Sequence, residues 1–420
     1  MFRFALNSFP TRLKLGKQVL CAFFVLLTIA ALPPSNAIAK TRTVGTTPES
    51  GQPLPNPDVL LIDVYKSLSA NNLRQAQAKA DELVEAYPHF QLGHLIRGDL
   101  LLMHTQPVTT FGAVKNAPAD KLKDLRDEAM VRIKSITQKP DPNLIPRSLL
   151  QLRDDQKLAL VVDAKKSRLY LYENNGGQPR FVADYYVSHG KFGMNKSSEG
   201  DQKTPIGIYY ITSRLAGARL PDFYGPGALP INYPNEWDKV NGRSGSGIWL
   251  HGMPSANFSR PPLASDGCVV LTNPDFLKIS AAIDIGKTPV IISEQVEFIN
   301  KAKWDSEKQL ANKLLDDWRR DAESADGNRI LANYSRNFKN AQGENINAWF
   351  SKQPQFDAQH HPSIKLSDVT QFRYPGKDEM IVCTFTQETT VGKSKNSIRK
   401  RQYWMKEASR WRIIYEGLVS

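Results

Sequence analysis

The sequence predicts a multidomain protein with an N-terminal helical region, a mostly β domain in the middle and a C-terminal α+β domain. Its 420 residues exceed what a single hydrophobic core usually holds. Apolar residues recur at helical spacing up to about residue 138, and short β-branched or aromatic runs separated by Gly, Pro and Asn follow from residue 157. From residue 300, helical patterns precede a run of strands, which is typical of an α+β domain.

The first 39 residues have the pattern of a secretory signal peptide. A basic, acid-free start precedes the apolar run 19–32, and Ala37-Ile38-Ala39 is a small-x-small cleavage signal. The apolar run is short for a membrane span of ~20 residues, so we expect cleavage, and membrane contact only through this segment if it stays uncleaved. Residues 40–57 are rich in Pro, Thr and Gly and predict a flexible leader. These features place the mature protein in the periplasm or the cell envelope.

The composition narrows the class of protein and of partner. Removing the four positive charges of residues 1–39 from the net charge of +13 leaves +9, which suits an anionic envelope polymer. Export argues against nucleic acid as a partner. Because Cys21 lies in the signal segment, the mature chain retains Cys268 and Cys383, too few for a disulfide scaffold.

Residues 58–146 predict a small helical domain. Helical spacing of apolar residues marks segments at 60–68, at 73–84, at 91–103 and at 120–138. The second segment stops at Tyr87-Pro88. Helix, turn, helix and proline resemble one tetratricopeptide-type repeat, but such arrays need about three copies to be stable. We therefore expect a helical domain of its own, with envelope proteins as its candidate partners.

Residues 157–295 predict the mostly β domain. Residues 163–167 have the pattern of a hairpin turn, and the expected strands are 158–162, 168–172, 181–187, 206–211, 247–251, 268–271 and 289–293. Between Leu215 and Ser246 the chain is rich in Gly and Pro. Loops of this length inside compact domains are usually functional or disordered. Since this stretch directly precedes the candidate site, we expect a lid or a substrate-binding loop.

Residues 300–420 predict the α+β domain. An amphipathic helix is expected over 304–323 and a second helical segment over 334–350. Strands are expected at 364–372, 379–389, 397–406 and 411–416. Helices followed by a curved sheet resemble the NTF2-like cone fold, a fold that does not by itself determine a function.

The strongest chemical signal is a histidine followed seventeen residues later by a cysteine. The two segments read Gly247-Ile248-Trp249-Leu250-His251-Gly252 and Ser265-Asp266-Gly267-Cys268-Val269-Val270-Leu271. A thiol is a poor nucleophile unless it is deprotonated, and a nearby imidazole can hold the thiolate as an ion pair. The glycine before the cysteine lets backbone N–H groups approach a developing oxyanion. A buried structural thiol is the alternative, and a zinc site would need more ligands than this stretch offers.

These segments resemble the L,D-transpeptidase family, also called the YkuD domain. The family signature is His-Gly, a variable gap and Ser-x-Gly-Cys. Thr204-Pro205-Ile206-Gly207 also resembles an upstream family segment. The resemblance covers residues 158–293. It implies that Cys268 attacks the third residue of a peptidoglycan stem tetrapeptide, that His251 shuttles the proton, and that the N–H groups of Gly267 and Cys268 bind the oxyanion. It further implies that the substrate is bound without metal or cofactor by Gly252, Ser265, Asp266, Thr204 and Pro205.

The sequence departs from the family pattern at two positions. Asp266 stands where many members have His or Lys, and Val270 where an arginine tied to substrate is common. We predict an L,D-transpeptidase that transfers the stem to an amine in wall cross-linking or remodelling. Two alternatives stay open: a carboxypeptidase or endopeptidase that uses water as the acceptor, and a non-catalytic wall-binding scaffold.

Overall fold

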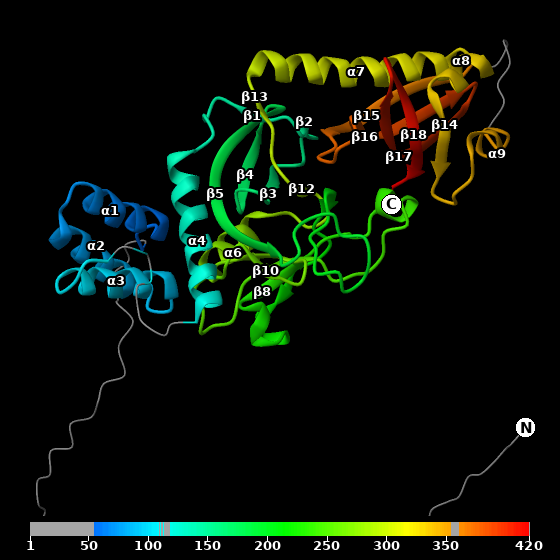
Figure 1. Ribbon diagram of the computed structural model, residues 1–420. Helices are drawn as coiled ribbons and strands as arrows, with labels where there is room; N and C mark the ends of the chain where they lie inside the picture. Colours follow the sequence, from blue (N-terminus) through cyan, green and yellow to red (C-terminus); the bar gives the residue numbers. More distant parts are fainter. Residues whose placement is uncertain (1–53, 109, 111, 113–117, 354–360, 420) are drawn as a thin grey trace, which may run out of the picture. The chain divides into compact units, whose positions relative to one another are not determined.

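The computed structural model describes residues 54–108, 110, 112, 118–353 and 361–419. The predicted signal peptide, and the leader apart from residues 54–57, lie outside the described residues. The three regions follow one another along the chain from blue to red in Figure 1, and the predicted fold class is confirmed. In the part of the chain that the structure describes, no helix combines the length and the apolar character that crossing a membrane requires.

The N-terminal region consists of four helices: α1 (Pro57–Ser69), α2 (Leu73–Ala86), α3 (Gln91–Met103) and α4 (Ala119–Thr137). The side chains of Asn56 and Asn72 cap α1 and α2 by accepting bonds from backbone N–H groups of the first turn. The apolar faces that the sequence pattern predicts meet in one core, whose fully buried members include Leu61, Leu83 and Phe90.

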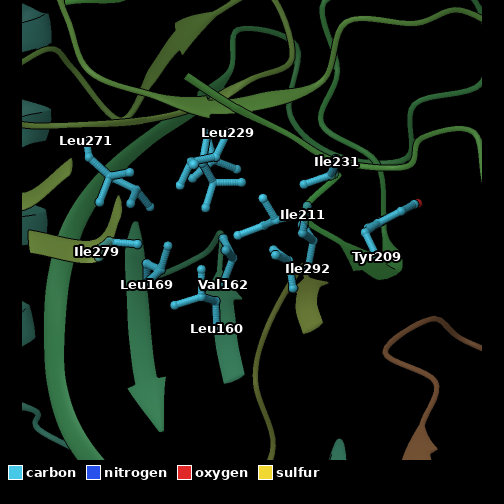
Figure 2. Close-up of a cluster of buried hydrophobic side chains, with 14 of the residues drawn as sticks. Leu160, Val162, Leu169, Tyr209, Ile211, Leu229, Ile231, Leu271, Ile279 and Ile292 are labelled. Atoms are coloured by element: carbon cyan, nitrogen blue, oxygen red, sulfur yellow. The ribbon is translucent and has the colours of Figure 1, made fainter. Parts of the chain in front are cut away.

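The middle domain is built on one long strand, β5 (Gln178–Gly190), which two sets of strands share. On one side lie β4 (Arg168–Asn175), β3 (Leu158–Asp163), β12 (Pro289–Ser293) and β6 (Gly207–Tyr210). On the other side lie β11 (Val269–Leu271), β9 (Trp249–His251), β8 (Gly227–Pro230) and β7 (Leu215–Ala216), and β10 (Leu263–Ser265) also pairs with β5. Apolar side chains from both sets form one core together with Ile279 of α6 (Asn273–Ala282), as Figure 2 shows.

The stretch from Leu215 to Ser246, expected as a loop, contains regular structure. It forms β7, the short helical turns η1 (Gly217–Arg219) and η2 (Asp222–Tyr224), β8 and α5 (Glu236–Val240). Strand β8 pairs with β9 and so extends the sheet beside the candidate site. Its four residues, Gly227 to Pro230, are too few to show a strand period in the sequence.

The C-terminal domain contains α7 (Lys301–Glu323), α8 (Gly327–Ala332), β14 (Tyr334–Asn340), α9 (Ile346–Phe350), β15 (Ser363–Arg373), β16 (Met380–Val391), β17 (Ser394–Glu407) and β18 (Arg410–Leu418). The predicted helix over 334–350 is wrong in its first half, which is strand β14 paired with β18. Tyr334 and Phe338 are four residues apart, a spacing that places side chains on one face of a helix and equally of a strand. Pairing with β18 decides for the strand.

The segment that follows α4 ties the middle and C-terminal domains together. Strand β1 (Ile145–Pro146) pairs with β13 (Phe298–Ile299), and β2 (Leu149–Gln151) joins the C-terminal sheet beside β15. Trp237 of α5 stacks on Tyr403 of β17 with ring centroids 5.2 Å apart. Buried apolar residues from the two domains therefore form one continuous cluster.

Candidate active site

The pairing of β11 with β9 brings the segment of Cys268 beside His251. β11 runs parallel to β9, with Val270 opposite His251. Cys268 directly precedes β11, two residues before Val270, and its Sγ donates to the carbonyl of Gly247 at 3.3 Å; the alternation of the strand, continued to this residue, would place its side chain on the face of His251. From strand spacing and rise, the two Cα atoms are separated by about 8 Å, a distance that a thiol and an imidazole can span together.

The imidazole of His251 is held in one orientation. His251 is buried, and its Nδ1 lies 2.5 Å from the carbonyl oxygen of Gly252. Because a carbonyl oxygen only accepts, Nδ1 carries the proton and Nε2 is left with a free lone pair. Gly252 must be a glycine, since a Cβ there would lie 2.5 Å from Oδ1 of Asn273.

Cys268 follows a tight turn that Ser265 stabilises. The hydroxyl of Ser265 donates to the carbonyl of Cys268 at 2.6 Å and accepts from the N–H of Gly267 at 3.2 Å. Gly267 has φ +121°, and a Cβ there would lie 2.7 Å from the Lys203 carbonyl oxygen. The Gly267 N–H is therefore already bonded, and its predicted role toward an oxyanion requires that long bond to be exchanged for one to the substrate.

The predicted Thr204-Pro205 segment supports this turn from behind. Thr204 is fully buried; its hydroxyl donates to the Gly267 carbonyl at 2.9 Å and accepts from the Gly190 N–H at 2.9 Å. Pro205 is buried next to it. Both residues act on the geometry of the turn, and a direct contact with substrate stays a prediction. Asp266 is exposed and accepts a 2.6 Å bond from the side-chain amide of Gln202.

Aromatic residues of η2 cover His251. The Tyr224 ring lies 5.0 Å from the imidazole in an edge-on arrangement, and the Phe223 ring lies 5.8 Å from it. Tyr224 also contacts Trp249 at 4.9 Å. Phe223 is 44% exposed, which leaves an apolar surface above the site. The segment expected as a lid thus contacts the candidate base directly.

Arg260 is a site residue that the sequence pattern did not identify. Its guanidinium carbon lies 4.8 Å from the centre of the Phe223 ring, and Phe223 in turn contacts His251. The charge of Arg260 acts on both His251 and Cys268. Arg260 lies on the irregular segment between the His251 and Cys268 motifs, where no sequence spacing marks a functional residue.

Burial favours the neutral forms of both candidate catalytic groups. It lowers the pKa of His251 to about 4; the bond to Gly252 opposes this shift, and the charge of Arg260 contributes to it. Burial raises the pKa of the Cys268 thiol to about 11, opposed by the Trp249 backbone N–H and by Arg260. At neutral pH the pair is accordingly a thiol and a neutral imidazole, not the ion pair expected from the sequence, because burial disfavours both charged forms. A neutral imidazole suits a base that takes the proton as attack occurs.

The other candidate groups lie apart from this chemistry. Cys383 is fully buried in the C-terminal core. His189 is buried and bonds the Ala164 carbonyl at 3.0 Å through Nε2. Among the described residues, no three His, Cys, Asp or Glu side chains gather in a way that could hold a metal ion.

Comparison with known proteins finds a matching family model for each of two domains. Residues 157–292 match the family model of the L,D-transpeptidase catalytic domain, YkuD. Residues 310–417 match that of the Cds6 C-terminal NTF2-like domain. The chain therefore carries a YkuD-type L,D-transpeptidase catalytic domain followed by an NTF2-like domain, which confirms the resemblance that the motifs indicated.

Two solved structures are similar in fold over about two thirds of the chain. The structure of Bd1075 from Bdellovibrio bacteriovorus is 28% identical, with a TM-score of 0.57, and the match covers 66% of this chain and 99% of that one. The helical cell shape determining protein Pgp2 from Campylobacter jejuni is 24% identical, with a TM-score of 0.54, and the match covers 67% of this chain and 97% of that one. A comparison with curated protein sequences finds no match.

Proposed function

We propose that this protein is an exported L,D-transpeptidase that acts on the peptide stems of peptidoglycan. Cys268 forms a thioester with the third residue of a stem tetrapeptide, the terminal D-alanine leaves, and an amine of another stem takes the acyl group. One observation carries the proposal: the strand that Cys268 directly precedes pairs with the strand that ends at His251, and the Gly252 carbonyl fixes the His251 tautomer. The YkuD family model supports the same chemistry.

The proton path follows from the neutral state of the pair. As the sulfur attacks the stem carbonyl, Nε2 of His251 takes the thiol proton, and backbone N–H groups at Gly267 and Cys268 receive the oxyanion. Collapse of the tetrahedral intermediate breaks the peptide bond, and the imidazolium of His251 gives its proton to the departing amine. The incoming amine then loses a proton to His251 as it attacks the thioester, and that proton returns to the sulfur.

Water is the second candidate acceptor. Val270 stands in β11, opposite His251, at the position where the family commonly has arginine. With water as the acceptor the product is a shortened stem, which is an L,D-carboxypeptidase reaction. The structurally similar Pgp2 is described as a helical cell shape determining protein, and we extend a role in cell shape to this chain under either acceptor.

Localisation and partners belong to the same proposal. The basic start, apolar run and cleavage signal in residues 1–39 support export to the periplasm. Peptidoglycan stems are the substrate, and the helical region is the surface that we assign to envelope proteins.

Purified muropeptides and mass spectrometry of the products test the proposal. Dimers with 3→3 links are expected for an amine acceptor, and shortened stems alone identify water as the acceptor. Cys268→Ala is expected to abolish turnover and the adduct with a carbapenem, whereas Cys383→Ala, which removes the buried core thiol, keeps both. An adduct that persists in the Cys268→Ala protein would rule out this nucleophile.

A further inference from the structure

The segment between His251 and Cys268 is held by the N-terminal helices. The Phe258 ring packs between Tyr87, at 4.6 Å, and Phe90, at 5.0 Å. The Phe258 N–H donates to the His89 carbonyl at 3.3 Å, and the Ser259 hydroxyl donates to Glu128 of α4 at 2.6 Å. The helical region thus fixes the residues directly before Arg260.

A buried charge cluster anchors this contact. Asp58 of α1 pairs with Arg132 of α4 at 2.5 Å and with Arg168 of β4 at 2.9 Å. The Arg132 guanidinium lies 3.9 Å from the centre of the Tyr186 ring. The hydroxyl of Tyr186 in turn donates to the carbonyl of Arg260 at 2.6 Å. Removing one member of such a buried ionic network leaves uncompensated charge, so the network resists rearrangement. Arg132 of this network packs on Tyr186, whose hydroxyl holds the backbone of Arg260.

The side chain of Arg260, by contrast, has its charge unpaired. Among the described residues, its guanidinium forms no hydrogen bond or ion pair and rests on the Phe223 ring. Asp266, whose charge acts on Arg260, is bonded to Gln202 instead. A guanidinium stays charged in proteins. A partly buried cation without a partner, beside a nucleophile, is poised to receive an anion.

We propose that Arg260 binds the terminal carboxylate of the donor stem. This inference rests on the proposed function. A guanidinium can bind a carboxylate with two parallel N–H···O bonds. The leaving residue would then be held by its carboxylate at Arg260 while its nitrogen receives the proton from His251. Arg260 supplies a positive charge from the loop, whereas position 270 of β11, where an arginine is common in the family, is a valine in this chain. The helical region holds Arg260 in place.

Two substrates that differ only at the C-terminus test the inference. One is a stem tetrapeptide whose C-terminal D-alanine has a free carboxylate, and the other is the same peptide with that carboxylate converted to an amide. We expect wild-type kcat/KM to favour the acid roughly 10- to 100-fold, the range for a charged hydrogen-bonded contact. Arg260→Gln is expected to abolish this preference, and Arg260→Lys to retain part of it. The control Arg180→Gln removes the same charge from an exposed, distant hairpin and keeps the preference.

A second probe separates this inference from the proposed function. Iodoacetate and iodoacetamide alkylate a thiol and differ in a carboxylate against an amide, so peptide mapping at Cys268 reports the anion site without any stem peptide. The quantity compared is the ratio of the alkylation rate with iodoacetate to that with iodoacetamide. A ratio that falls in Arg260→Gln, together with a wild type that does not turn over stems, would support the anion site and contradict the proposed function. Stem turnover with an acid preference that Arg260→Gln leaves unchanged would overturn the role of Arg260.

Discussion

Thr204→Val isolates the hydrogen bonds that hold the nucleophile's turn. Valine has nearly the shape of threonine but lacks the hydroxyl that bridges the Gly190 N–H and the Gly267 carbonyl, each at 2.9 Å. Both backbone groups are buried, and neither is offered a new partner. Leaving a buried polar group without a bond costs about 1–3 kcal/mol. Because two such groups lose their partner, we expect the free energy of unfolding to fall by about 2–6 kcal/mol.

The assay combines stability with chemistry at Cys268. Urea denaturation followed by circular dichroism gives the change in free energy, and the rate of carbapenem adduct formation reports whether the Gly267–Cys268 turn has moved. Thr204→Ser keeps the hydroxyl and loses one methyl group, which is worth about 1 kcal/mol. Thr212→Val removes an exposed hydroxyl that bonds one carbonyl and serves as the matched control, expected within about 0.5 kcal/mol of wild type. Equal stability of Thr204→Val and wild type would refute the bridging role.

Two further predictions concern the same site. Gly267→Ala is expected to lower the free energy of unfolding by about 2–5 kcal/mol and to remove most Cys268 acylation, because φ is +121° and the new Cβ would lie 2.7 Å from the Lys203 carbonyl oxygen. Gly242→Ala is the control: with φ +69° and open space around its Cβ, it should lower the free energy of unfolding by only ~1 kcal/mol. Equal losses for the two variants in urea titrations would contradict the steric account. Because burial lowers the pKa of His251 to about 4, the acylation rate should fall only as the pH drops through about 4. The free energy of unfolding should fall as the pH drops from about 6.5, the ordinary pKa of histidine, to about 4, because in this range the unfolded chain binds a proton that the folded chain does not. A pH–rate profile with its midpoint near 6.5 would show that the imidazole is not buried as the structure has it.

Local patterns in the sequence were sufficient for the order of the domains and for the identity of the candidate pair. Helical spacing marked α1 to α4, and short β-branched runs marked β3, β4 and β12, because these segments bury one regular face. The histidine–glycine and serine–x–glycine–cysteine segments are local signals too. They predict Cys268 and His251 as the catalytic pair, and this stays a prediction; the YkuD match spans the stretch that contains both residues.

Tertiary structure decided what depends on distant partners. Residues 334–340 form β14 because β18 offers a ladder, although the spacing of Tyr334 and Phe338 fits a helix as well. The protonation states of Cys268 and His251 follow from burial, which a sequence does not give. Arg260 reaches the site because Phe258 packs on the helical region and Tyr186 bonds the Arg260 backbone. The physical reason is common to all three: the deciding interactions join residues far apart in the chain, and no local pattern records them.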